Sequence, residues 1–375
     1  MSTTNLNRDV ACLQDIEDYA HAVLPRNALD YYRSGADQML SLQDNRDAFA
    51  RYRLLPRMLR DVSTRSLDTV VLNGRARAKT PIGVAPTAMQ RMAHPDGELA
   101  AARAAQDAGA VFIMSTISTT SLEDVAAAAP DATKWFQLYI YKDRAVTEEI
   151  VRRAERAGFA ALVLTVDAPY FGQRLPDARN KFQLPPHLTM ANFRGLGEDI
   201  EKRAGKSGGG SGISNYVNAL FDPTLSWEDV KWLQKFTTLP VILKGILSPA
   251  DALLAVNLGI PALIVSNHGA RQLDGVQATV DALGPIARAV GHRCELYLDG
   301  GVRTGTDVLK ALALGARMVF VGRPVLWGLA YGGREGVALT LGILRAELDR
   351  AMGLAGIASI EEITKEYVIA PRAAL

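Results

Sequence analysis

The sequence predicts an α/β protein, a closed (β/α)8 TIM barrel with an N-terminal helical segment and a long insertion after its fourth strand. Eight short apolar runs follow one another from residue 81 onward, and helical segments separate them. Such repeated alternation is typical of a closed parallel barrel, and 375 residues suit one. An open doubly wound sheet is the alternative, but no G-x-G-x-x-G pattern follows the first strand, which disfavours it.

Each predicted strand is short and nearly continuously apolar, as a parallel strand buried on both faces should be. Each run also ends in polar residues or glycine, which marks the point where the chain leaves the sheet. The predicted strands are residues 81–86, 111–116, 134–140, 161–167, 240–246, 262–268, 294–301 and 318–323.

Helical segments follow the strands in turn. Residues 97–109 are alanine-rich and end at a glycine, and residues 121–129 open with a Ser-x-x-Asp pattern that resembles a capping box. Residues 145–158 carry glutamates early and arginines late, which suits the helix dipole. The same form predicts further helices over residues 248–259, 279–290, 305–315 and 334–353.

The domain organisation follows from these elements. We expect one domain over residues 1–375, with a helical cover in residues 1–80 and the barrel in residues 81–360. The insertion, residues 168–226, contains the glycine–serine stretch 205–212, which is flexible by composition. Because an insertion after a barrel strand lies at the end where chemistry occurs, we interpret it as a mobile lid, with a passive surface loop as the alternative.

Charge and cysteine content exclude several classes of function. The chain has 42 basic and 40 acidic residues and no dominant basic stripe, which predicts no nucleic-acid and no anionic-membrane partner. No run of about 18 apolar residues is present, so no membrane span is expected. Two isolated cysteines, Cys12 and Cys294, cannot form a zinc site or a disulfide framework, so we predict no metal and a reducing compartment.

The chain termini bear on location. The N-terminal MSTTNLNRDVAC has no apolar stretch of the signal-peptide type, and the C-terminal PRAAL lacks an SKL-type peroxisomal tripeptide. We therefore expect a cytoplasmic protein, with the peroxisome as the alternative.

Polar residues gather at the predicted strand ends. In this architecture the catalytic groups come from the C-terminal ends of the strands, which converge on one axis. Any one such residue can serve packing, but their joint occurrence predicts a single polar site. In strand order they are Thr87; Ser115 and Thr116; Gln137 and Tyr139; Thr165 and Asp167; Lys244; Ser266, Asn267, His268 and Arg271; Asp299, Gly300, Gly301 and Arg303; and Gly322 and Arg323.

The last two strand ends predict a phosphate site. Both combine glycines, which let the backbone approach a ligand, with an arginine, and a helix N-terminus follows at Gly305. Tight-turn geometry is the alternative reason for the glycines. Lys244 is placed to stabilise negative charge on an electron-rich ring, and Gln137 is one of several side chains able to hydrogen-bond a flat heterocycle. Together these features describe flavin mononucleotide (FMN).

His268 is the only histidine at a predicted strand end. Metal binding is excluded because no second histidine has ligand spacing. Across the barrel mouth, Asp167 is positioned to accept a hydrogen bond from the imidazole, which would orient His268 as a general base. Arg271 can grip a carboxylate by two parallel hydrogen bonds.

Several motifs resemble those of the FMN-dependent (S)-2-hydroxy acid oxidase family, which includes glycolate oxidase and L-lactate oxidase. The likeness covers almost the whole chain. The motifs are DYYRSGA (30–36), NRDAFARYRLLPRMLRDVS (45–63), APTAMQRMAHPDGE (85–98), FQLYIYKDR (136–144), LTVDAPYFGQRLPDARNKF (164–182), LPVILKG (239–245), SNHGARQLDG (266–275), DGGVRTGTDVLKALALGA (299–316) and VGRP (321–324).

The resemblance implies a role for each matching residue. His268 is the implied base with Asp167 as its partner, and Tyr139 lies beside the hydroxyl-bearing carbon of the substrate. Tyr31 and Arg271 bind the substrate carboxylate, with Arg174 nearby on the insertion. The implied FMN-binding residues are Ala85, Pro86, Thr87, Ala88, Ser115, Gln137, Thr165, Lys244, Ser266, Asp299, Gly300, Gly301, Arg303, Gly322 and Arg323.

The implied reaction oxidises a small 2-hydroxy acid to a 2-oxo acid, and O2 then reoxidises the flavin to give H2O2. The alternative is a dehydrogenase that passes electrons to a quinone or another acceptor. The resemblance also implies a homotetramer. Ile117 stands where many glycolate-preferring relatives carry an aromatic residue, so we expect L-lactate to be used at least as well as glycolate. A nucleotide-oxidising barrel is rejected because neither cysteine ends a strand, and a non-enzymatic phosphate-binding barrel leaves His268 unexplained.

Overall fold

The computed structural model describes residues 10–196 and 219–371. It confirms the predicted barrel: eight parallel strands pair in chain order, and the last pairs with the first to close the sheet. All the strands except the fifth, which ends at Ile246 as predicted, end before their predicted boundaries because the polar residues after them turn out of the sheet. The strands are β4 (Ile82–Val84), β5 (Phe112–Met114), β6 (Lys134–Leu138), β7 (Ala161–Thr165), β8 (Val241–Ile246), β9 (Ala262–Val265), β10 (Glu295–Asp299) and β11 (Met318–Val321).

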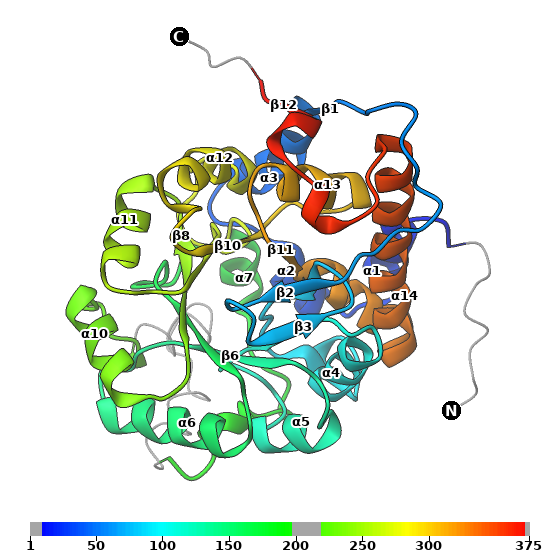
Figure 1. Ribbon diagram of the computed structural model, residues 1–375. Coiled ribbons are helices and arrows are strands. Elements are labelled where there is room, and N and C mark those ends of the chain that lie inside the picture. The colour runs from blue at the N-terminus through cyan, green and yellow to red at the C-terminus, as the bar shows by residue number, and fades with distance from the viewer. Residues whose placement is uncertain (1–9, 197–218, 372–375) are drawn as a thin grey trace.

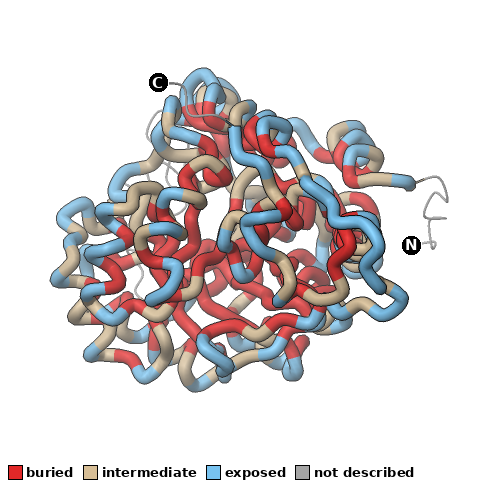
Figure 2. Tube along the Cα trace, turned by 45° about the horizontal axis from the view of Figure 1, so that its top comes forward, coloured by how far each residue is buried: buried red, intermediate tan, exposed pale blue. Residues whose placement is uncertain are grey.

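Large side chains fill the inside of the barrel. Trp135 lies with its ring centroid 5.5 Å from that of Tyr297 and 5.6 Å from that of Phe320. All three side chains are buried, and the tube representation in Figure 2 shows buried residues concentrated in the middle of the molecule. Because this interior is packed, a ligand has room only at the mouth of the barrel.

Helices surround the barrel, as Figure 1 shows. The predicted Ser121 cap is present, since its hydroxyl accepts a hydrogen bond from the Asp124 N–H. The helix predicted over 334–353 is present as the second part of α14. Gly332 and Gly333, whose backbone angles are not helical, separate it from a first part that begins at Arg323. The surrounding helices are α4 (Gly97–Asp107), α5 (Leu122–Ala128), α6 (Arg144–Arg156), α10 (Trp227–Phe236), α11 (Pro249–Asn257), α12 (Thr279–Val290), α13 (Gly305–Ala313) and α14 (Arg323–Ala355).

The segment before the barrel is helical only in its first part. It contains α1 (Leu13–Val23), α2 (Arg26–Arg33) and α3 (Leu40–Arg51), followed by β1 (Arg53–Leu54), which pairs with β12 (Val368–Ile369) near the C-terminus. Two turns, η3 (Ile360–Glu362) and η4 (Lys365–Tyr367), precede β12. The expectation of a purely helical cover was therefore incomplete.

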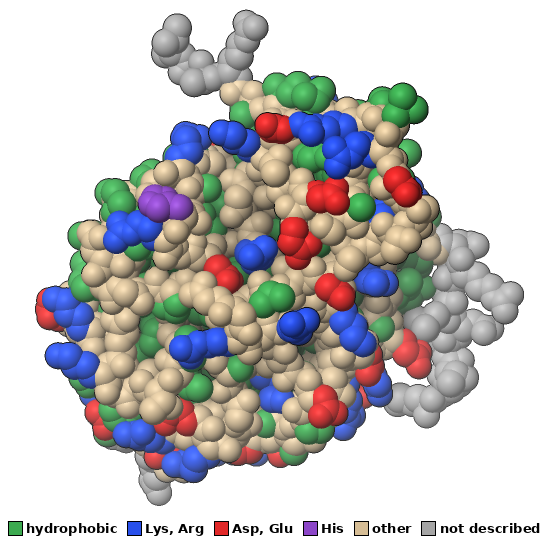
Figure 3. Space-filling model, in the orientation of Figure 1, with side chains coloured by type: hydrophobic (Ala, Val, Ile, Leu, Met, Phe, Trp, Pro, Cys, Tyr) green, Lys and Arg blue, Asp and Glu red, His purple; other side chains and the backbone are tan. Residues whose placement is uncertain are grey.

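A hairpin of β2 (Thr69–Val71) and β3 (Ala76–Ala78) covers the N-terminal end of the barrel (Figure 1). The Leu72 N–H donates to the Glu295 carboxylate and to the Tyr297 hydroxyl, at 2.9 and 3.2 Å. Both acceptors belong to β10. The space-filling view of this side shows acidic and basic side chains interspersed (Figure 3).

The described part of the insertion packs against the N-terminal helices. Its helix α7 (Leu175–Asn180) lies against α2, where Asn180 donates to Asp30 at 2.6 Å and Phe182 stacks on Tyr31 with centroids 4.5 Å apart. Two 3-10 turns, η1 (Gln90–Met92) and η2 (Ala191–Phe193), complete the described elements. The glycine–serine stretch 205–212 lies outside the described residues, and the lid interpretation stays a prediction.

The described helices include no candidate for a membrane span. Across residues 10–196 and 219–371, none of the helices combines the length and the apolar character that a bilayer span requires.

The bend in α14 generates a prediction about stability. A Cβ at Gly336 would lie 2.0 Å from the carbonyl oxygen of Gly328, whereas Gly342 in the same helix is exposed with nothing within 4 Å. Gly336→Ala should therefore lower the free energy of unfolding by about 1–3 kcal/mol. Gly342→Ala should raise it by about 0.5–1 kcal/mol, since alanine favours helix. Thermal unfolding midpoints of the two variants measure this, and equal midpoints would contradict the close packing.

Candidate active site

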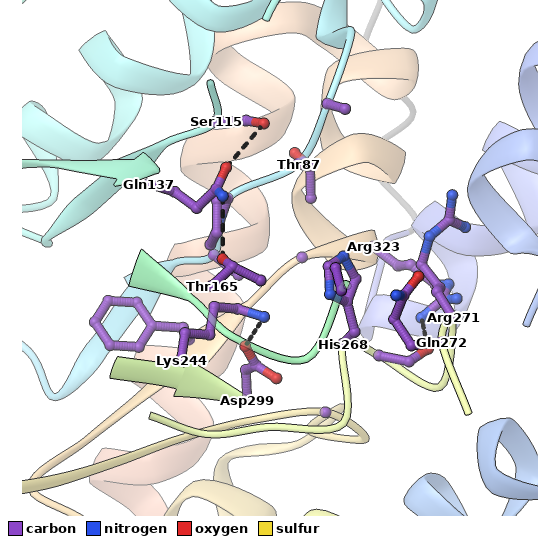
Figure 4. A pocket seen from close by; sticks show the side chains of 18 of the residues that line it. Thr87, Ser115, Gln137, Thr165, Lys244, His268, Arg271, Gln272, Asp299 and Arg323 are labelled. Atoms are coloured by element: carbon purple, nitrogen blue, oxygen red, sulfur yellow. Dashed lines mark hydrogen bonds and ion pairs between the residues drawn. The ribbon is translucent and has the colours of Figure 1, made fainter. Parts of the chain in front are cut away.

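One pocket opens where the C-terminal ends of the barrel strands meet. Its empty space is about 1140 Å³, part of it open solvent. Figure 4 shows polar side chains from several strands pointing into it. Nearly all the predicted site residues line it: Tyr31, Ala85, Pro86, Thr87, Ala88, Ser115, Gln137, Tyr139, Thr165, Arg174, Lys244, His268, Arg271, Asp299, Gly300, Gly301, Arg303, Gly322 and Arg323.

His268 and Asp167 form the predicted pair. The Nδ1 atom of His268 lies 2.7 Å from Oδ1 of Asp167, and the two side chains are 20% and 13% exposed. Asp167 itself stands just behind the pocket wall. With Nδ1 bound to the carboxylate, Nε2 is left to exchange a proton with a ligand.

Burial and charge tune this pair in opposite ways. Burial lowers the pKa of His268 below its ordinary value, and the Asp167 charge only partly offsets this. Burial acts to raise the pKa of Asp167, but the charges of His268 and Lys244 outweigh it and hold that pKa below its usual value. His268 is therefore neutral and Asp167 ionised near pH 7, which is the state a general base requires.

A strained turn aims the imidazole. His268, Gly269 and Ala270 have φ values of 59°, 60° and 61°, all in the left-handed region. Such a conformation costs a residue other than glycine about 1–3 kcal/mol and persists only where the surroundings enforce it. The Ser266 hydroxyl accepts from the His268 N–H at 3.1 Å and the Asn267 side chain accepts from Ala270 at 3.1 Å, so neighbouring polar groups hold the turn.

Three buried or half-buried guanidinium groups converge beside this turn. Arg271 donates to the carbonyls of Tyr31 and Ser34 at 2.7 and 3.1 Å, and Arg174 donates to the Arg271 carbonyl at 3.3 Å. Arg323 donates to the carbonyls of Tyr32, Gly269 and Ser34 at 2.8–3.0 Å.

The positive charge of these groups is not neutralised locally. In the part of the chain that the structure describes, none of the three pairs with a carboxylate within 4.0 Å. Burial and the neighbouring Arg271 lower the pKa of Arg174 to about 9. Uncompensated buried cations are costly, so this cluster is suited to bind anionic ligands.

A second positively charged part of the pocket lies where β10 and β11 end. Gly300 and Gly301 have φ values of 97° and 82°, which bring their backbone close to the pocket. The Nε atom of Arg303 is buried and has no hydrogen-bond partner among the described residues, and its nearest carboxylate, Glu17, is 3.6 Å away. A buried cation whose Nε makes no hydrogen bond to the described residues, beside a glycine turn, fits a phosphate.

A row of hydrogen-bonded side chains joins the strand ends, as Figure 4 shows. Gln137 accepts from Ser115 at 3.4 Å and donates to Thr165 at 3.0 Å. Further round, the Lys244 ammonium lies 3.3 Å from the Asp299 carboxylate. These groups present hydrogen-bonding atoms at one level, which suits the edge of a flat ring.

Ser266 differs from its predicted role. It is fully buried and does not line the pocket. Its hydroxyl accepts from Lys244 at 3.0 Å and donates to Asp299 at 2.6 Å, so it positions the lysine and the carboxylate from behind. Its predicted direct contact with a cofactor finds no support in this placement.

Several lining residues escaped the sequence reasoning. Tyr32 donates to the Met89 carbonyl at 2.7 Å, and its position beside Tyr31 in DYYRSGA was the available signal. Phe221, whose ring centroid lies 4.3 Å from that of Tyr139, lies near the end of the insertion and carried no signal at all. The others are Ala168, Tyr170, Phe171, Gly269, Gln272, Val302, Phe320, Val321, Pro324 and Leu326.

Neither cysteine lines the pocket, and no cluster of three or more metal-ligating side chains occurs within residues 10–196 and 219–371. The site thus combines a histidine–aspartate pair, a cluster of arginines beside it and a glycine turn suited to a phosphate. These features define a barrel enzyme that binds a phosphorylated cofactor together with an anionic substrate.

Known proteins give this class its family. The model of the FMN-dependent dehydrogenase family matches residues 20–370. The human protein 2-hydroxyacid oxidase 1 is 52% identical, over 95% of this chain and 96% of its own length. Glycolate oxidase 1 of Zea mays is 50% identical over 96% of both chains. A solved structure of mandelate oxidase with (S)-4-hydroxymandelic acid superposes with a TM-score of 0.89, at 45% identity over 94% of this chain and 97% of that one.

The chain therefore belongs to the FMN-dependent dehydrogenase family, and its cofactor is FMN. The pocket fits that cofactor at three points. Arg303, whose Nε makes no hydrogen bond to the described residues, would hold the phosphate together with the Gly300–Gly301 backbone. Lys244 would offset negative charge on the ring, and Gln137 would hydrogen-bond the ring edge.

The phosphate assignment predicts a selective loss of affinity. Arg303→Met should raise the Kd for FMN about 10- to 100-fold, because a charge-assisted hydrogen bond is lost, while the Kd for riboflavin stays unchanged. Quenching of flavin fluorescence on titration of apoprotein measures both. Arg317→Met, at an exposed position at the opposite end of β11, is the matched control. An equal effect on both flavins would contradict the assignment.

Proposed function

We propose that the protein oxidises (S)-2-hydroxy acids to 2-oxo acids with bound FMN, and that O2 reoxidises the flavin to give H2O2. The observation that carries this proposal is the 2.7 Å contact between His268 and Asp167 beside an arginine cluster without carboxylate partners. A base next to a carboxylate-binding site fits a substrate with a hydroxyl group on the carbon that bears its carboxylate. The names of the related oxidases support the same class.

Each side chain has a defined task in this mechanism. Arg271 and Arg174 hold the substrate carboxylate, since both line the pocket and neither is neutralised. Burial raises the pKa of Tyr139, which keeps its phenol protonated and able to donate a hydrogen bond to the substrate oxygen. Tyr31 lines the same end and stacks on Phe182.

His268 removes the proton during oxidation. Its Nε2 accepts the proton, and Asp167 stabilises the imidazolium that forms. Bound FMN would supply the two-electron acceptor that this oxidation requires. The low-dielectric pocket strengthens each of these charge interactions.

O2 is the proposed acceptor because the curated relatives are named oxidases. The quinone-dependent dehydrogenase has no comparable support. The homotetramer and the cytoplasmic location stay predictions from the sequence, as do the residue roles above.

Ile117 generates a prediction about the substrate. It lines the pocket and is 5% exposed. A branched aliphatic side chain leaves more room than an aromatic one, so kcat/KM for L-lactate should at least equal that for glycolate. Ile117→Trp should lower the lactate-to-glycolate ratio about tenfold or more, since glycolate lacks the methyl group that would meet the indole. Steady-state kinetics with both acids measure the ratio, and a wild-type preference for glycolate would contradict the prediction.

The proposed base is tested by anaerobic titration with L-lactate. Wild-type enzyme should lose its yellow colour as the flavin is reduced. His268→Ala should retain bound FMN but reduce it about 10²–10⁴-fold more slowly, because no group takes the proton. Asp167→Asn should slow reduction and also move the acidic limb of the pH profile to lower pH, since the Asp167 charge raises the pKa of His268.

Admitting air should then reoxidise the flavin and yield H2O2 equimolar with the 2-oxo acid. Slow reoxidation by O2 with fast reduction of an artificial dye would favour the dehydrogenase instead. Loss of flavin from His268→Ala in parallel with activity would mean that the imidazole only supports the fold.

A further inference from the structure

Gln272 makes three hydrogen bonds to the start of the insertion. Its Nε2 donates to the carbonyls of Asp167 and Tyr170, at 3.1 and 2.7 Å, and its Oε1 accepts from the Gly172 N–H at 3.1 Å. These three backbone groups lie about 100 residues earlier in the chain. One side-chain amide thus satisfies two acceptors and one donor of a single loop.

The two segments also touch through their backbones. A Cβ at Gly172 would lie 2.3 Å from the Arg271 carbonyl oxygen and 2.6 Å from Gln272 Cα, so only glycine permits this approach. Next to it, the Gln173 carbonyl accepts from the Asp37 N–H at 2.8 Å. The loop therefore packs closely against the turn after β9, and the Gln272 amide adds three hydrogen bonds to the contacts that Arg174 and Asp167 make with that turn.

The loop of residues 167–174 contains several residues with proposed roles in catalysis and substrate binding. Asp167 orients His268, Tyr170 and Phe171 line the pocket, and Arg174 belongs to the carboxylate site. Gln272 also lines the pocket, next to Arg271 in Figure 4. A displacement of this loop would disturb the base and the substrate-binding cation together.

We propose that Gln272 is a positioning residue that holds residues 167–174 against the turn after β9. In this way it sets both the orientation of Asp167 and the position of the Arg174 guanidinium. This inference rests on the proposed function of those two residues. An amide is suited to the task because it offers a donor and an acceptor at one point. A carboxylate keeps the acceptor but turns a negative oxygen toward two carbonyls, and a thioether offers neither.

The test compares Gln272→Met and Gln272→Glu with Gln277→Met in the flavin-loaded enzyme. Gln277 is exposed and lies in the same connection, and among the described residues its side-chain amide donates to the Leu247 carbonyl alone, at 3.1 Å. With rates normalised to bound flavin, both Gln272 variants should lower kcat/KM for L-lactate about 10- to 30-fold, the loss expected from one to two hydrogen bonds. The effect should divide between a raised KM, from Arg174, and a lowered kcat, from Asp167. Gln277→Met should match the wild type.

Hydrogen exchange gives a readout that does not need catalysis. The amide of Gly172 should exchange at least tenfold faster in both Gln272 variants and at the wild-type rate in Gln277→Met. Unchanged exchange, or a lowered melting temperature with wild-type KM and kcat, would overturn the proposal. A wild-type enzyme that L-lactate and glycolate fail to reduce would instead refute the proposed function, whatever the exchange rates are.

Discussion

Uncompensated positive charge at the barrel mouth is the constraint on which the site depends. Arg174, Arg271 and Arg323 are held by backbone carbonyls, and none pairs with a carboxylate in the described residues. Burying such charge is unfavourable unless hydrogen bonds and an anion compensate it. The carbonyls come from residues 31–34 and 269–271, so the N-terminal helices and the turn after β9 must dock together for the cluster to exist.

The packed barrel is the rigid support for this arginine cluster. Because aromatic side chains fill the interior and the β2–β3 hairpin covers the far end, the strand ends at one mouth supply the binding surface. Hydrogen bonds then connect adjacent strand ends: Ser266 links Lys244 with Asp299, and Gln137 links to Thr165. A displacement of one strand end is thereby passed to its neighbours, which keeps the cofactor-binding groups at one level.

The histidine pair shows how burial and charge cooperate. Burial alone would leave His268 a weak base, and Asp167 restores part of its basicity while fixing which nitrogen is free. The left-handed turn at residues 268–270 stores strain that the surrounding hydrogen bonds must offset. The Gln272 amide donates a hydrogen bond to the Asp167 carbonyl, so both His268 and Asp167 are held by contacts between distant segments.

The sequence by itself determined the barrel and its eight strands, and nearly all the residues that it predicted for the site line the pocket, because apolar runs and the polar residues that end them are local patterns. FMN followed from the same strand ends and the family motifs. Only the tertiary structure decided that Ser266 stands behind Lys244, that β2 and β3 interrupt the helical cover, and that Phe221 and Gln272 reach the pocket. These depend on contacts between segments as far as 225 residues apart, and the approach of such segments is set by packing rather than by local preference.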